Sequence, residues 1–130
     1  MVFDTNVYEQ FENAIKEKAA SGDSDAEEDL QYVKQTVLAC AEYVHRVTEE
    51  QIEVRLARGV LSGNELREVV EHFDATRHAA HERAIVHVCM LNRMAAAYGF
   101  GRIYLGDESI RREIGNFCGE FVSWFFVNRS

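Results

Sequence analysis

The sequence predicts an all-α protein: an antiparallel helical bundle of about four to five helices built on a long central helical hairpin, about 25–58 and 64–98. Three observations predict this class. The 130 residues include no proline, apolar residues recur at spacings of three and four over long stretches, and the stretch 64–98 contains no glycine. A chain of this length typically forms one domain, so we expect a single helical domain over 1–130.

The regular pattern over 64–98 predicts one long helix. Ser62 followed by Glu65 has the form of a capping box, and Gly99 stands where a left-handed C-terminal cap is expected. From Ile85 to Ala97 the far side is apolar as well, so we expect that half to be surrounded by other helices. The seam positions that share one face, at spacings of four and three, are Leu66, Val70, Phe73, Arg77, Ala80, Ala84, His87, Leu91, Met94 and Tyr98.

The other half of the hairpin is predicted at about 25–58. Acidic residues open it, where they face the positive end of the helix dipole. The apolar pattern is regular as far as Val47 and then slips to Ile52, Leu56 and Val60. Either the helix continues beyond Val47, or it breaks there and a short helix follows. The match in length with the second hairpin helix favours a continuous helix.

Two shorter helices flank the hairpin. The first is predicted at about residues 6–20. The last is expected from about Glu108 to Val127, after an N-cap at Asp107. It should begin where the long helix ends and return antiparallel along its second half. Gly115 and Gly119 lie four residues apart in this last helix, a spacing that predicts close approach of another backbone.

This topology brings four helices together at one end of the hairpin and leaves the other end, about 47–77, as a two-helix projection. Two helices bury little, so Val54, Val60, Leu61 and Val69 lack obvious partners within the chain. A second subunit would complete a four-helix arrangement. We therefore predict a homodimer, or contact with another protein, with these four residues at the interface.

Composition limits the remaining function classes. The net charge of -8 argues against non-specific binding of nucleic acid. No run of about 18 apolar residues is present and no signal peptide is visible, so no membrane association is expected. The three cysteines match no zinc spacing, which favours reduced thiols in a cytoplasmic protein. No cofactor is predicted.

The best candidate for chemistry is a histidine cluster. Asp74, His78 and His81 are spaced by four and three, so they share one side of the long helix. Two imidazoles and a carboxylate could bind a transition metal. The alternative is an exposed helical face on which Asp74 and His78 form an i,i+4 pair. The Glu-x-x-His repeats of ferritin-like bundles and the His-Glu-x-x-His pattern do not occur.

Three arginines suggest a possible anion or ion-pair site. Arg77 lies on the apolar seam, so it must be paired or must reach solvent. Acids between 49 and 53 on the preceding helix could pair with it at a subunit interface; an anion pocket is the second interpretation. Arg102 lies within the glycine-rich stretch Gly99–Asp107 and Arg111 follows it, and free amides of this stretch could bind an anion.

No motif fixes a reaction, and no arrangement of Ser, His and Asp or of Cys and His predicts a nucleophile. The sequence therefore favours a non-enzymatic, dimeric helical interaction module. The alternative is a small-ligand or metal-binding bundle that uses the His/Asp cluster.

Overall fold

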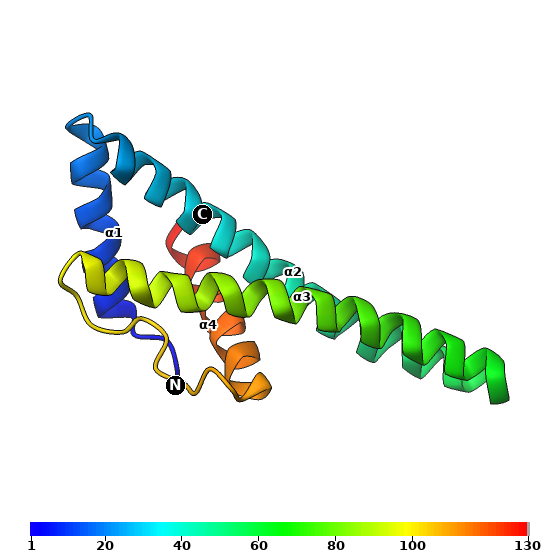
Figure 1. Cartoon of the computed structure of the whole chain (residues 1–130). Helices are drawn as coiled ribbons and strands as arrows, with labels where there is room; N and C mark the ends of the chain where they lie inside the picture. Colours follow the sequence, from blue (N-terminus) through cyan, green and yellow to red (C-terminus); the bar gives the residue numbers. More distant parts are fainter. Residues whose placement is uncertain (130) are drawn as a thin grey trace.

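The computed structural model describes residues 1–129 of the chain, with side chains for 1–128. Four helices follow one another: α1 (Thr5–Ala20), α2 (Ser24–Val60), α3 (Gly63–Ala97) and α4 (Arg111–Arg129). The described residues contain no strand beyond an isolated antiparallel bridge between Phe3 and Tyr104. The predicted all-α bundle on a long hairpin is confirmed, and α2 and α3 form that hairpin (Figure 1).

The first hairpin helix, α2, is continuous through Val47. Thr48 does not cap a new helix, because its hydroxyl donates to the Val44 carbonyl four residues back, at 3.0 Å. At the tip, the predicted capping box is wrong. Ser62 precedes α3 with extended backbone and its side chain makes no cap hydrogen bond. Gly63, with a φ of 59°, turns the chain into α3 instead.

The core lies where α1 and α4 meet one end of the hairpin. Tyr8, Phe11 and Ile15 form a fully buried face of α1. The rings of Tyr8 and Phe121 meet edge to face with centroids 5.2 Å apart, and Phe3 meets Phe121 in the same way at 5.3 Å. Such pairs contribute roughly 0.5–1.5 kcal/mol each beyond the burial of their area. This aromatic cluster holds α1 and α4 together.

The connection from α3 to α4 decides where α4 starts. Gly99, with a φ of 87°, ends α3 as expected. Asn92 then holds the returning chain against α3: its Oδ1 accepts from the amides of Ile103 (2.8 Å) and Tyr104 (2.9 Å), and its Nδ2 donates to the Tyr104 carbonyl. The chain therefore runs back along α3 before α4 begins, and the predicted start of the last helix at the end of α3 is wrong.

The last helix, α4, begins at Arg111, three residues later than expected. Asp107 caps a separate turn, since its Oδ1 accepts from both the amide and the hydroxyl of Ser109. Figure 1 shows α4 crossing the hairpin helices instead of running along α3. The predicted backbone contact at its two glycines is also wrong. A Cβ added at Gly115 would lie 3.6 Å from the Tyr43 ring rather than against a backbone, and one added at Gly119 would have no described atom within 4 Å.

The second half of α3 is covered on only part of its circumference. The buried side carries Val88 and Leu91, both at 0% exposure. Val86 and Met90 lie on the other side and are 60% and 36% exposed, so the prediction of a helix surrounded on all sides is wrong. Too few helices pack here to cover both sides. Within the described part of the chain, no helix is long and apolar enough to cross a bilayer.

Candidate functional site

The hairpin end beyond the core is a two-helix arm, which we define as Val47–Val60 of α2 with Gly63–Arg77 of α3. Figure 1 shows it projecting well away from the bundle. Every residue from 44 to 79 is described, and among them only Ala57 is buried. The contact between the two arm helices is therefore a thin seam, and most apolar side chains of the arm reach solvent.

The outer side of α2 in the arm carries large exposed apolar side chains. Ile52, Leu56 and Val60 are 52%, 62% and 82% exposed. They follow one another at spacings of four, so they form a stripe along the helix. We call these three residues the outer stripe. Contiguous exposed apolar surface of this kind marks interaction sites in soluble proteins.

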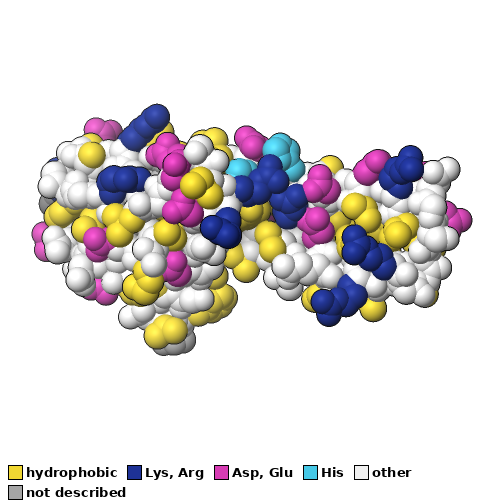
Figure 2. Space-filling model, turned by 90° about the horizontal axis from the view of Figure 1, so that it is seen from below, with side chains coloured by type: hydrophobic (Ala, Val, Ile, Leu, Met, Phe, Trp, Pro, Cys, Tyr) yellow, Lys and Arg dark blue, Asp and Glu magenta, His cyan; other side chains and the backbone are white. Residues whose placement is uncertain are grey.

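A groove of about 950 Å³ runs beside the outer stripe. Three arginines line it, Arg55 and Arg58 from α2 and Arg77 from α3. Figure 2 shows hydrophobic side chains on the arm bordered by Lys and Arg side chains. The other lining residues are Val47, Glu50, Gln51, Ile52, Val54 and Leu56.

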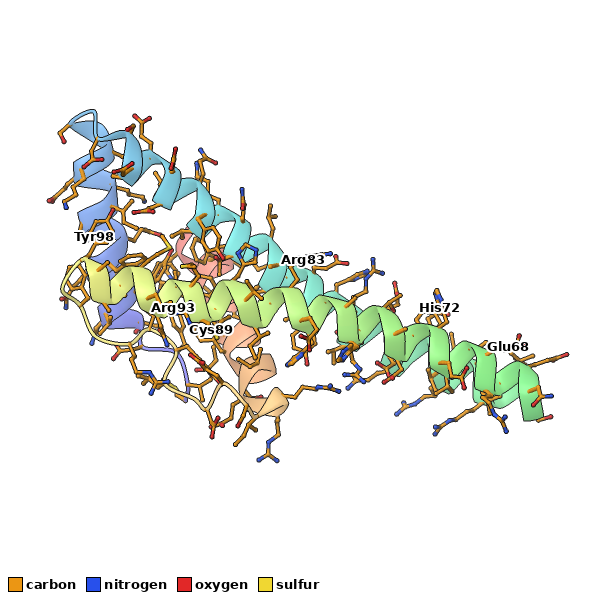
Figure 3. All side chains as sticks on the ribbon, viewed as in Figure 1. Glu68, His72, Arg83, Cys89, Arg93 and Tyr98 are labelled. Carbon is orange, nitrogen blue, oxygen red and sulfur yellow. The ribbon has the colours of Figure 1, made fainter. Side chains whose placement is uncertain are left out.

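A second groove, of about 430 Å³, belongs to the tip and α3. It combines apolar and acidic side chains, and two of its residues, Glu68 and His72, project outward from α3 (Figure 3). The remaining lining residues are Leu61, Glu65, Val69 and Phe73. The arm therefore presents an arginine-lined groove along α2 and an acid-lined groove along α3.

Three of the four predicted interface residues lie in the arm, and the fourth, Leu61, lies in the turn at its tip. Val60 is exposed, while Val54, Leu61 and Val69 are half-buried at the edges of the seam. The sequence interpretation did not name Ile52 or Leu56 as interface residues. The signal that could have found them is the slip in the apolar pattern after Val47. It shows a second apolar face on a helix that remains continuous.

Arg77 joins the two arm helices. Its Nε donates to Glu50 of α2, and its Nη2 donates to Asp74 one turn earlier in α3. Glu50 is one of the acids expected to face Arg77. The side chains of Arg77 and Glu50 are 17% and 23% exposed, so the pair is partly shielded from water.

The histidine cluster does not assemble as a ligand set. Asp74 is held by Arg77, while Nδ1 of His78 accepts from Nη2 of Arg111 of α4 at 3.3 Å. His78 Nε2 lies 3.7 Å from a Glu82 oxygen. Among the described residues, no group of three His, Cys, Asp or Glu side chains could hold a metal ion.

His81 is buried where the arm joins the core. It is 7% exposed, and neither ring nitrogen has a hydrogen-bond partner. The ring packs against the edge of the Tyr43 ring of α2, with centroids 5.3 Å apart. The nearest carboxylate oxygen, on Glu82, is 3.6 Å from Nδ1. Burial lowers the pKa of His81 below its usual value, and the charge of Arg111 lowers it further.

The three arginines of the predicted anion site fall into two places. Arg77 and Arg111 both lie near Tyr43, whose pKa is raised by burial and lowered by these two charges, with a net increase. Arg102 is engaged elsewhere: its Nη2 donates to the Gly106 carbonyl at 2.9 Å and closes the loop before α4. Figure 2 shows Lys or Arg side chains gathered beside histidine where the arm leaves the core.

The fold and this surface define a small all-α protein with an aromatic helical core and an uncovered apolar two-helix arm. The family model described as "Protein of unknown function (DUF3232)" matches residues 5–130, and the chain belongs to this family. Neither a curated protein nor a solved structure matches the chain. The geometry of the arm is therefore the basis for assigning a function.

Proposed function

We propose that this protein is a non-enzymatic helical interaction module that forms a homodimer through its two-helix arm. The observation that carries the proposal is the burial pattern of the arm. Over residues 44–79, all of them described, Ala57 alone is buried, while Ile52, Leu56 and Val60 expose at least half of their surface. A helix that is apolar on two sides is normally covered on both.

The arm of a second copy would cover this exposed apolar side with the same kind of apolar surface. Two arms side by side make a four-helix arrangement, which is how helices of this type usually bury their apolar stripes. The arm also presents charges of both signs, with arginines along one groove and Glu65 and Glu68 along the other. A surface of mixed charge can associate with itself without bringing only like charges together.

The expected affinity is modest. Full burial of Val, Leu or Ile contributes about 1.5–3 kcal/mol. Covering the exposed fractions of the three outer-stripe residues therefore contributes roughly 1–2 kcal/mol each, or about 6–12 kcal/mol for two copies. Association itself costs about 4–15 kcal/mol in lost freedom. At the favourable end of both ranges the balance is about −8 kcal/mol, which corresponds to a dissociation constant on the order of micromolar.

Light scattering coupled to gel filtration, between about 1 and 200 µM, tests the proposal. The wild-type chain of 14.9 kDa should approach twice that mass as the concentration rises. Leu56→Asp should remain a monomer because each dimer would bury two carboxylates. Val86→Asp is the matched control, since Val86 is 60% exposed on α3 outside the arm. A wild-type monomer throughout this range would refute the proposal.

We also propose the cytoplasm as the compartment. All three cysteines are free, with Cys40 and Cys118 buried, and such thiols persist in a reducing environment. Fractionation of cells that express the tagged full-length chain tests this. Recovery outside the cytoplasmic fraction would contradict it.

A further inference from the structure

The charged residues around the outer stripe are divided by sign. With about 100° of rotation per residue, Glu53 lies about 60° to one side of Leu56 and Arg55 about 100° to the other. Glu49 lies within about 20° of Leu56, and Arg58 lies nearly opposite it. The arginine side is the 950 Å³ groove, and neither acid lines it. The outer face of α2 therefore has an apolar centre, an acidic edge and a basic edge.

The charged side chains around the stripe differ in whether they already form an ion pair within the chain. In the described chain Arg46 holds Glu49 at 3.0 Å, whereas Glu53, Arg55 and Arg58 form no ion pair within 4.0 Å. The unpaired charges thus stand on opposite sides of the stripe. They are available to pair with a partner surface on which the acidic and basic edges are exchanged.

We propose that the occupant of this face is a second copy of the chain, with the two α2 helices side by side and parallel, so that both arm tips point the same way. A two-fold axis that runs along the helices exchanges the two edges. The acidic edge of each copy then meets the arginine-lined groove of the other, while the outer stripes meet at the axis. This inference rests on the proposed homodimer and specifies its geometry.

The other two-fold arrangement is disfavoured by the same charges. An axis perpendicular to the helices gives antiparallel α2 helices and leaves each edge facing its own copy. Glu53 would then lie on the same side as the partner's acids, and Arg55 on the same side as the partner's arginines. Juxtaposed like charges weaken association. The parallel arrangement also leaves the second groove, which contains Val69, outside the contact.

Disulfide cross-linking distinguishes the two arrangements. In a parallel two-fold pair each residue of the outer stripe lies opposite its own copy. Ile52→Cys, Leu56→Cys and Val60→Cys, each tested alone, should therefore all give covalent dimers on oxidation with diamide. An antiparallel pair brings only the residue on the axis close to itself. Val86→Cys controls for random collision, and wild type controls for the native thiols. Cross-linking at Leu56→Cys alone, or at no position above the controls, overturns the parallel geometry.

A charge exchange tests the edges independently. Glu53→Arg and Arg55→Glu should each weaken dimerisation by about two- to thirtyfold, because exposed pairs contribute about 0.2–1 kcal/mol and two form per dimer. The double variant should restore the wild-type dissociation constant. A double variant weaker than both single variants overturns the assignment of edges.

Val69→Asp should dimerise like wild type. If Val69→Asp instead fails to dimerise while Leu56→Asp still dimerises, the choice of face is overturned. These outcomes are distinct from failure of the proposed function. In that case light scattering detects no wild-type dimer at all.

Discussion

His81→Leu should stabilise the protein. The imidazole lies at the joint between arm and core, with Tyr43 of α2 on one side and Arg111 of α4 nearby. It is 7% exposed, and neither of its nitrogens has a hydrogen-bond partner. Leucine has a similar volume and no polar atoms, so the substitution removes unsatisfied polar groups while it keeps the site filled.

The magnitude follows from the cost of an unmet hydrogen bond. Leaving a buried polar group unsatisfied costs about 1–3 kcal/mol. The neutral ring has one donor and one acceptor, and small adjustments of Glu82, 3.6 Å from Nδ1, relieve part of the cost. We therefore expect His81→Leu to raise the free energy of unfolding by about 1–3 kcal/mol at pH 7.5. For a chain of this size, that corresponds to an increase in Tm of about 4–10 °C.

The increase in the free energy of unfolding caused by His81→Leu should become larger as the pH falls. The pKa of His81 is lowered in the folded state, by burial and by Arg111. The unfolded chain therefore binds this proton more readily than the folded chain does. The wild type loses stability as the pH falls below the ordinary histidine value of about 6.5, by at most about 1.4 kcal/mol per pH unit. His81→Leu removes this contribution, so its stability should vary less between pH 7.5 and 5.5.

Urea unfolding followed by circular dichroism at pH 7.5, 6.5 and 5.5 measures both effects. The control is His72→Gln, because His72 is an exposed arm residue and its loss should change stability by less than about 0.5 kcal/mol. The reasoning is refuted if His81→Leu is less stable than wild type at pH 7.5. A pH dependence equal to that of wild type would refute the linkage argument.

Three further substitutions test the fold around the site. Asn92→Ala should cost about 3 kcal/mol in urea unfolding, because it leaves three backbone groups of the returning loop without partners. Gly106→Ala should cost about 1–3 kcal/mol in the same assay, since a new Cβ would lie 2.5 Å from the hydroxyl of the fully buried Tyr104. Arg77→Ala should cost about 1 kcal/mol and increase amide hydrogen exchange in the arm, because it leaves Glu50 unpaired between the helices.

Two of these have a matched control. Asn128→Ala removes an exposed amide that donates only to the Trp124 carbonyl, and it should be nearly neutral. Gly101→Ala places a Cβ where no atom lies within 4 Å, and it should also be nearly neutral. Equal costs for a test variant and its control would contradict the structural reason given. For Arg77→Ala, unchanged exchange in the arm would show that the ion pair does not hold the two helices together.

The helices themselves follow from local sequence. The α2 and α3 patterns extend over many turns, so short-range spacing is enough to place both hairpin helices within a few residues of their observed bounds. The projection of the arm also follows, because it depends only on unequal helix lengths. The uncovered apolar residues there were expected for that reason. In the sequence, the slip to Ile52 and Leu56 indicated only a choice between a continuous and a broken helix, and the structure shows that it marks a second apolar face on a continuous α2.

The placement of α4, and the partners that the polar candidate site residues find, depended on tertiary contacts. The position where α4 begins is decided by Asn92, which binds a loop segment 11 and 12 residues away, and no periodic pattern reports such a bond. Asp74, His78 and His81 share a helix side by spacing. Arg77 nevertheless holds the first, Arg111 contacts the second, and Tyr43 covers the third. Helical spacing is local, whereas the partner of a charged or polar side chain is set by whichever helix packs against it.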